Sequence, residues 1–194
     1  MRSILILGVV ITLFYLCVPS IGAQETFTGN IIKYGSGRYT GVRTGTFTLT
    51  LNRLTSDAQT QADLAALQSG QDKLLDAIRS EDVGRLTFTG ELGRTINAAR
   101  EVNVGGMRKI YAVFERWTEF AEIRGGYRSL DYPFGYIELT IDPRTGKGSG
   151  QYFAAAKIRW KNNNKEGIGR HIEIEDYATF PAKLVNVRAK GMER

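Results

Sequence analysis

The sequence predicts a mainly β protein: an antiparallel β-barrel or β-sandwich of about eight to ten strands, with one helical insertion at about residues 57–79. Most of the chain alternates apolar and polar residues with a period of two, which is typical of strands with one buried and one solvated face. Residues with turn chemistry stand between the alternating segments, as hairpin connections require. A single segment repeats its apolar residues at helical spacing instead.

Residues 46–51 give the clearest strand. Phe47, Leu49 and Leu51 fall on one face, and three threonines fall on the other. Threonine is β-branched and suits a pleated, solvated surface. The same alternation recurs in Leu86 with Phe88, in Ile137 with Leu139 and Ile141, and in Ile172 with Ile174.

Two later segments extend the predicted sheet. Ala154, Ala156, Ile158 and Trp160 form an inward row opposite Lys157, Arg159 and Lys161, whereas residues 110–117 are apolar on both faces and suit a central strand covered on both sides. Proline and glycine in Asp142–Gly146 favour a tight turn. Asparagine tolerates left-handed backbone, so Asn162–Lys165 favours a second hairpin loop.

The helical segment at 57–79 has an apolar stripe. Ser56 and Gln59 have the spacing of a capping box, and Asp57 suits the positive start of a helix. Gly70 is expected to divide the segment into two short helices or to kink one helix. The stripe is expected to pack on the sheet or to close a barrel end; its members are Ala58, Leu64, Leu67, Leu74, Leu75 and Ile78.

Residues 1–23 have the layout of a secretory signal peptide. Arg2 precedes the apolar run 4–18, and small residues follow up to Ala23. The run is about 15 residues long, which is short of the ~20 that a membrane-spanning helix needs. We expect cleavage near Ala23 and a secreted or periplasmic protein. An uncleaved anchor and lipidation at Cys17 are the alternatives.

Cleavage would leave a single β-rich domain at residues 24–194, with no cysteine and no transmembrane helix. A chain of about 170 residues buries enough surface to fold without disulfides. Its formal charge is 25 − 20 = +5, because only Arg2 is lost from the 26 basic residues, against 20 acidic ones. The bases are scattered, so no nucleic-acid partner is expected.

Catalytic chemistry is sparse in this sequence. His171 is the single histidine, and it is expected to lie in a strand beside Glu173 and Glu175 in an exposed charge ladder. No nucleophile motif or metal-ligand spacing is present. We therefore predict no catalytic residue, no metal site and no cofactor.

The segment from Gly125 to Tyr136 gathers aromatic side chains beside one arginine and one aspartate, a combination that binding surfaces often use. Packing of these aromatics over the sheet is the structural alternative. The candidate ligand-binding residues are Tyr127, Arg128, Asp131, Tyr132 and Tyr136.

Three segments carry a resemblance to a known group of proteins: residues 131–139 (DYPFGYIEL), 154–157 (AAAK) and 54–59 (LTSDAQ). Here the chain resembles a family of uncharacterised secreted β-rich bacterial proteins. The resemblance implies export and a globular fold. It implies no activity, cofactor or catalytic residue.

The leading functional hypothesis is a non-enzymatic secreted or periplasmic module that binds a small molecule, a glycan or a peptide. A structural or interaction protein of the cell envelope and a carboxylate-based hydrolase are the alternatives. An apolar cavity of ~300 Å³ or more would favour small-molecule binding, whereas a solid interior would favour surface recognition. The sequence does not determine the oligomeric state.

Overall fold

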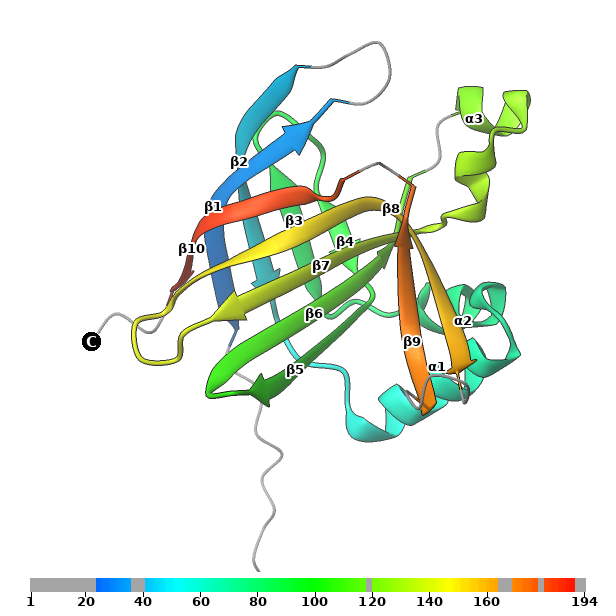
Figure 1. Ribbon diagram of the computed structural model, residues 1–194, viewed down its shortest axis with the longest axis horizontal. Coiled ribbons are helices and arrows are strands. Elements are labelled where there is room, and N and C mark those ends of the chain that lie inside the picture. Colours follow the sequence, from blue (N-terminus) through cyan, green and yellow to red (C-terminus); the bar gives the residue numbers. More distant parts are fainter. Residues whose placement is uncertain (1–23, 36–40, 118–119, 164–168, 178–179, 191–194) are drawn as a thin grey trace, which may run out of the picture.

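The computed structural model describes residues 24–35, 41–117, 120–163, 169–177 and 180–190. The predicted signal peptide, with Cys17, lies outside them. Ten antiparallel strands form one strongly curved, barrel-like sheet in the order β4-β3-β2-β1-β10-β8-β7-β6-β5, with β9 paired to β8 (Figure 1). The strands are β1 (Glu25–Tyr34), β2 (Val42–Leu51), β3 (Gly84–Phe88), β4 (Arg94–Ile96), β5 (Ala98–Val104), β6 (Met107–Glu115), β7 (Phe134–Ile141), β8 (Lys147–Asn163), β9 (Gly169–Asp176) and β10 (Ala182–Lys190).

This confirms the mainly β, antiparallel fold class. The barrel interior is filled by the alternating apolar rows predicted from the sequence. Phe47, Leu49 and Leu51 are buried there, and so are Ile137, Leu139 and Ile141. β7 is joined to β8 at the predicted turn 142–146, and β8 to β9 across the predicted loop 162–165, of which residues 164–165 lie outside the described chain.

The barrel closes at a seam between β4 and β5, which are the two ends of the strand order. No hydrogen-bonded ladder joins β4 to β5. Instead Asn97, the one residue between them, forms hydrogen bonds both with β6 and with the connection between α2 and β3. Its backbone N–H donates to Val113 O (2.9 Å) and its side-chain oxygen accepts from the backbone N–H of Glu115 (2.8 Å). Its side-chain nitrogen donates to the carbonyls of Glu81 (2.9 Å) and Arg79 (3.3 Å). Asn97 is buried, so these bonds are shielded from water.

An ion-pair triad links the neighbouring strands β5 and β6 to β1, which is not their neighbour in the sheet. Arg108 on β6 donates two bonds to Glu25 on β1 (both 2.8 Å) and two to Glu101 on β5 (2.8 and 2.7 Å). The Arg108 side chain is only 11% exposed. Its guanidinium holds the pKa of Glu101 below the ordinary range, chiefly through hydrogen bonding.

The predicted helical insertion is two helices, α1 (Asp57–Ser69) and α2 (Gln71–Ile78), divided at Gly70, whose φ of 141° suits glycine. Ser56 caps α1 by accepting from the backbone N–H of Gln59 (3.1 Å). The Gln59 side chain turns instead to Asp63 (2.8 Å), so only half of the expected capping box forms. Leu67, Leu74, Leu75 and Ile78 are buried as predicted, whereas Ala58 is exposed.

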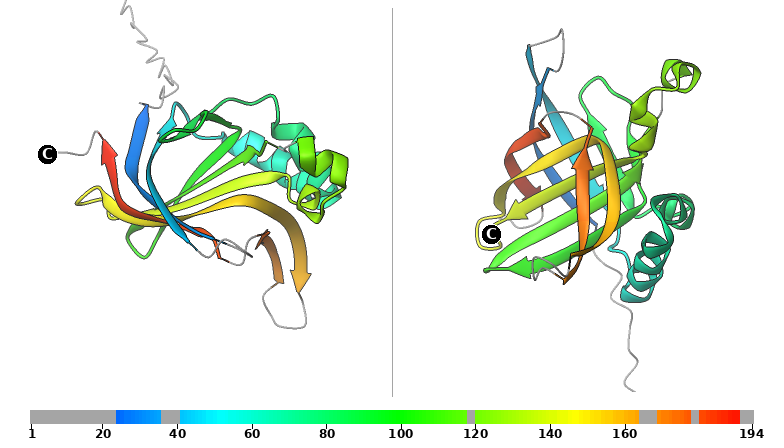
Figure 2. Two further views of the ribbon diagram at one scale, coloured as in Figure 1. Left: turned by 90° about the horizontal axis from the view of Figure 1, so that it is seen from above. Right: turned by 45° about the vertical axis from the view of Figure 1, so that its right-hand side comes forward.

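The helical pair packs on the outer face of the sheet (Figure 2). β6 is therefore covered on both faces as predicted: Ile110, Ala112 and Phe114 face the barrel interior, while Tyr111 and Val113 face the helices. The strand ends at Glu115 rather than at residue 117, and Trp117 is 57% exposed.

The distal half of β8 leaves β7 and continues only with β9. We call residues 156–163 with β9 the overhang; it curls away from the barrel beside the helices (Figure 2). A bulge precedes it, because Phe134 and Tyr136 on β7 pair with Ala156 and Phe153 on β8. The extra β8 residue exchanges the two faces of the strand. Ala156 and Ile158 consequently face the helices, whereas Ala154, predicted to point inward, is exposed.

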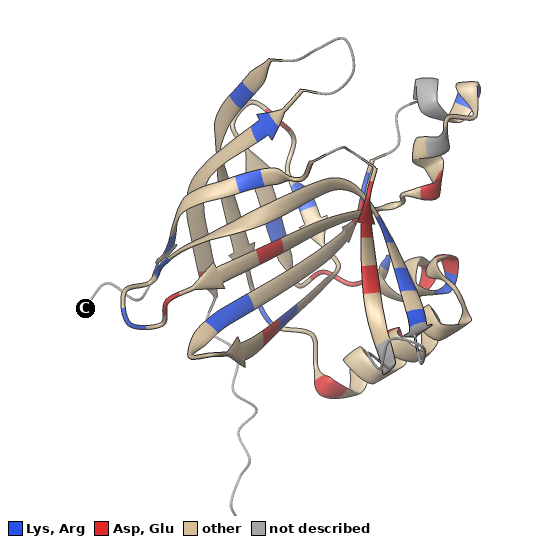
Figure 3. Ribbon diagram, in the orientation of Figure 1, with Lys and Arg blue, Asp and Glu red and all other residues tan. Residues whose placement is uncertain are grey.

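The other face of the overhang carries charges, with basic residues on β8 opposite acidic ones on β9 (Figure 3). Arg159 pairs with Glu175, and Lys161 lies 3.6 Å from Glu173. His171 stands opposite Lys161 in the register, as the charge-ladder interpretation expects.

Two short helical turns follow β6 and were not expected from the sequence: α3 (Phe120–Gly125) and η1 (Arg128–Asp131). Among the helices that the structure describes, none is both long enough and apolar enough to cross a bilayer.

Candidate functional site

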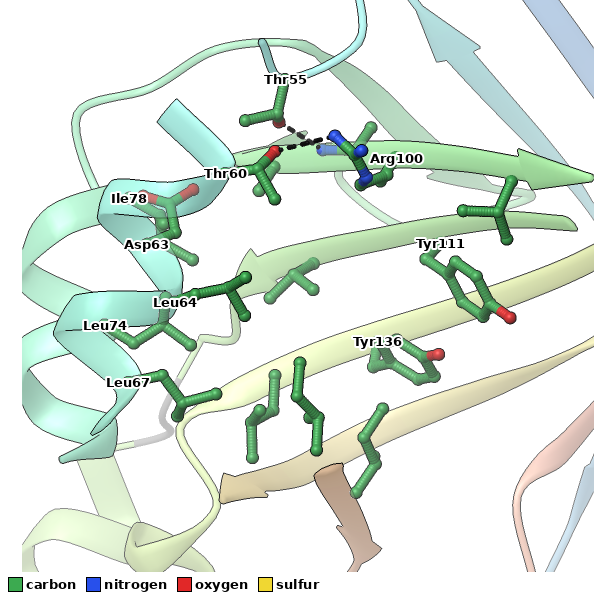
Figure 4. A pocket seen from close by; sticks show the side chains of 17 residues that line it. Thr55, Thr60, Asp63, Leu64, Leu67, Leu74, Ile78, Arg100, Tyr111 and Tyr136 are labelled. Atoms are coloured by element: carbon green, nitrogen blue, oxygen red, sulfur yellow. Dashed lines mark hydrogen bonds between the residues drawn. The ribbon is translucent and has the colours of Figure 1, made fainter. Parts of the chain in front are cut away.

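A cavity of about 450 Å³ lies between the helical pair, the outer face of β5 to β7 and the overhang (Figure 4). We call it the helix–sheet cavity. It is outside the barrel, and most of its lining is hydrocarbon. The residues that line it are Thr55, Thr60, Asp63, Leu64, Leu67, Leu74, Ile78, Ala98, Ala99, Arg100, Val102, Tyr111, Val113, Tyr136, Ile158, Ile172 and Ile174.

On each wall of the cavity, the residue pattern of one helix or strand determines which side chains face inward. The leucines of α1 recur at helical spacing, so Leu64 and Leu67 lie on the same face. Odd-numbered residues of β6 face outward, which places Tyr111 and Val113 opposite them. The bulge in β8 turns Ile158 toward the helices, and Ile172 and Ile174 follow on β9.

Hydrogen bonds fasten the entrance of the helical pair to β5. Thr55 donates its backbone N–H to Ala99 O (2.8 Å), and its hydroxyl accepts from Ala99 N–H (2.9 Å). At the other end, the side chain of Gln71 donates to Asp131 O (3.2 Å). The cavity between these attachments is thus bounded by anchored elements.

A polar rim borders the cavity where α1 meets β5. Arg100 donates one bond to Asp57 (2.8 Å) and one to the Thr60 hydroxyl (3.2 Å), as Figure 4 shows for the second. The Arg100–Asp57 pair is exposed, with side-chain exposures of 44% and 89%. Exposed pairs of this kind contribute only ~0–1 kcal/mol, so a ligand anion can compete with Asp57 for Arg100.

Asp63 is the buried acid of the cavity wall. It lies on α1 with 8% of its surface exposed, and its carboxylate accepts from the Gln59 amide (2.8 Å). Burial raises the pKa of Asp63; the Gln59 bond opposes this, and repulsion from Glu81 adds to it. A ligand carboxylate inside the cavity would lie close to the Asp63 carboxyl group, which disfavours a second negative charge there. The interior therefore favours the uncharged part of a ligand.

Tyr111 and Tyr136 form the aromatic part of the sheet wall. Their rings stack with centroids 6.4 Å apart, and Phe153 meets Tyr136 edge-on at 5.3 Å. Figure 4 shows both hydroxyls directed along the sheet and away from the helices. Burial raises the pKa of Tyr136 well above its ordinary value, so this phenol is neutral at physiological pH.

The structure separates the ligand-binding residues predicted from the sequence. Only Tyr136 lines the helix–sheet cavity. Tyr127 is exposed and precedes η1, whereas Arg128 and the exposed Asp131 are its first and last residues. Tyr132 is buried, donates to Glu175 and packs against Tyr177, which is the structural alternative for this aromatic. A ligand role for Tyr127, Arg128, Asp131 and Tyr132 stays a prediction.

Sequence reasoning missed most of the cavity. Asp63, Arg100 and Tyr111 were not singled out, because polar residues on a helix and in a strand ordinarily face solvent. The two-sided apolar character of residues 110–114 was the available signal, since a strand covered on both faces requires a second layer outside the sheet.

No family model, curated protein sequence or solved structure matches this chain. The resemblance to secreted bacterial proteins therefore stays a prediction. Among the residues that the structure describes, no group of three or more His, Cys, Asp or Glu side chains is placed to hold a metal ion.

Proposed function

We propose that this protein is a binding module for a small, mainly hydrocarbon ligand with one anionic end, held in the helix–sheet cavity. The observation that carries this proposal is the cavity of about 450 Å³ itself, which lies within the ~300–1,000 Å³ range of small-molecule sites and has an almost entirely apolar lining. Its polar rim is formed by Arg100 with Asp57 and Thr60. A fatty-acid-like molecule has the matching distribution of polarity.

The apolar interior of the cavity and its polar rim together determine how the ligand would be oriented. Leu64, Leu67 and Val113 offer only hydrocarbon to the body of the molecule. Each buried CH₂ contributes ~0.8 kcal/mol, so a short chain is sufficient for measurable affinity. Arg100 would receive the carboxylate in place of Asp57 at the exposed rim.

A cavity-filling variant tests this function. Ala98 is on β5 and borders the cavity, so Ala98→Phe places a ring in the space that the ligand would occupy. We expect the affinity for N-phenyl-1-naphthylamine, a neutral apolar fluorophore, to fall at least tenfold, and dodecanoate to displace the fluorophore from the wild type. Fluorescence titration measures both, and circular dichroism checks the fold.

Val104→Phe is the matched control, because Val104 lies on the same strand, is 53% exposed and does not line the cavity. It should bind the fluorophore as the wild type does. Arg100→Gln should weaken dodecanoate but not dodecanol. Unchanged binding by a folded Ala98→Phe variant would exclude the cavity as the site.

We propose further that the chain acts outside the cytoplasm, which is supported by the layout of residues 1–23. Sequencing the N-terminus of protein expressed in a bacterial host should give a chain beginning close to Gln24 in the exported fraction. An intact Met1 on cytoplasmic material would contradict export.

A further inference from the structure

A second, polar hollow of about 630 Å³ lies at the seam of the barrel. It is formed by the residues after α2, the connection into β4 and the end of β6, and we call it the seam cleft. Its lining includes Arg79, Ser80, Arg94, Thr95, Glu115 and Trp117. Unlike the helix–sheet cavity, it is lined mainly by charged and hydroxyl-bearing side chains.

Trp117 and Arg94 form a stacked pair in this cleft. The Arg94 guanidinium lies 3.8 Å from the centre of the indole ring, and Trp117 is 57% exposed. Arg94 also donates to the backbone carbonyl of Leu92 (3.2 Å), which is a neutral acceptor. Within the described chain no carboxylate contacts Arg94. A guanidinium binds a carboxylate in a two-pronged geometry, so Arg94 is the side chain of this cleft on which we place a ligand carboxylate.

The acidic residues of the cleft are already engaged. Glu115 pairs with Arg79 (3.0 Å), and Glu81 pairs with Arg53 (2.6 Å). Their oxygens can still accept hydrogen bonds from hydroxyl groups, as can Ser80 and Thr95. Because both carboxylates are paired with arginines, and the lining holds Arg79, Arg94 and Arg116 against these two acids, the cleft favours an anionic ligand that also carries hydroxyls.

We propose that the seam cleft binds an acidic sugar, with its carboxylate on Arg94, its ring against Trp117 and its hydroxyls on the polar side chains around them. This site is separate from the helix–sheet cavity and does not depend on the function proposed there. Tryptophan and arginine are each enriched among the residues that contribute most to binding at protein interfaces.

Tryptophan fluorescence tests the proposal directly. Trp160 is the other tryptophan, so Trp160→Phe leaves Trp117 as the single reporter. In that background D-glucuronate should change the emission in a saturable way, and added salt should weaken the effect. D-glucose has the ring without the carboxylate, and acetate has the carboxylate without the ring; each should bind at least tenfold more weakly.

Arg94→Gln, which keeps a planar amide at the position, should weaken glucuronate binding about tenfold or more. Arg144→Gln is the control, because Arg144 lies in the turn between β7 and β8 and its side chain is 89% exposed. Three outcomes would overturn the proposal: no saturable response to glucuronate, an equal response to glucose or acetate, or unchanged affinity in a folded Arg94→Gln variant.

Discussion

Replacing Arg108 by methionine is expected to lower the free energy of unfolding by about 3 kcal/mol and the melting temperature by about 6–12 °C. The substitution keeps an unbranched side chain but leaves Glu25 and Glu101 facing each other at partly buried positions, with side-chain exposures of 26% and 23%. Two carboxylates that share a site without a cation are destabilising. Urea or thermal denaturation followed by circular dichroism measures the loss.

The matched control adds Glu25→Gln and Glu101→Gln to Arg108→Met. This variant removes the charges together, so most of the lost stability should return. An Arg108→Met protein as stable as the wild type would show that the triad does not hold the barrel together.

The same triad predicts how stability depends on pH. The folded pKa of Glu101 is lowered, so the folded state binds fewer protons than the unfolded state near the ordinary pKa of 4.5. Its contribution is therefore present above about pH 4.5 and is lost as the pH falls through the lower, folded pKa. Arg108→Met removes the cause of the shift, and its stability should decline less between pH 6 and pH 3 than that of the wild type.

Asn97→Ala is the second substitution with a large expected effect, a loss of about 3 kcal/mol. It removes three side-chain hydrogen bonds at the seam, to the carbonyls of Arg79 and Glu81 and from the N–H of Glu115. Each of the three lost bonds contributes ~1 kcal/mol net, which gives this figure. Denaturant unfolding gives the magnitude, and amide hydrogen exchange should show faster exchange at Glu115.

Asn52→Ala is the comparison, because Asn52 is exposed and its side chain accepts one bond, from Gln24 (3.0 Å). Its effect should stay within ~0.5 kcal/mol. Asn97→Asp keeps the acceptor for Glu115 but sets an oxygen against two carbonyls, so it should also destabilise. Equal stability of Asn97→Ala and Asn52→Ala would contradict the role of Asn97 in closing the barrel.

The barrel strands could be predicted because the residue patterns that indicate them lie within short stretches of the sequence. Phe47, Leu49 and Leu51 alternate with threonine over six residues, and Gly70 marks a helix boundary by its own backbone preference. The choice between barrel and sandwich was not predictable. It depends on Asn97 meeting Val113 and Glu115, and nothing near residue 97 in the sequence indicates those partners.

The helix–sheet cavity was harder to predict from the sequence than the barrel. Its walls come from two helices and five strands, and their apolar residues look like ordinary core positions. The bulge in β8 decides that Ile158 faces the helices. It falls between Phe153 and Ala156, where Ala154 and Ala155 give the sequence no contrast between apolar and polar positions that would indicate it. The aromatic segment at 125–136 drew attention because it is compact in sequence, but in space its tyrosines diverge.

The position of the cavity outside the barrel has a kinetic consequence. A guest that lodges between α1 and β6 can arrive and depart through a local displacement of the two helices, while the strand ladders stay intact. Such sub-global openings require far less free energy than complete unfolding. Exchange of the proposed ligand would therefore not require the barrel core, where Phe27, Phe47 and Leu49 are fully buried, to open.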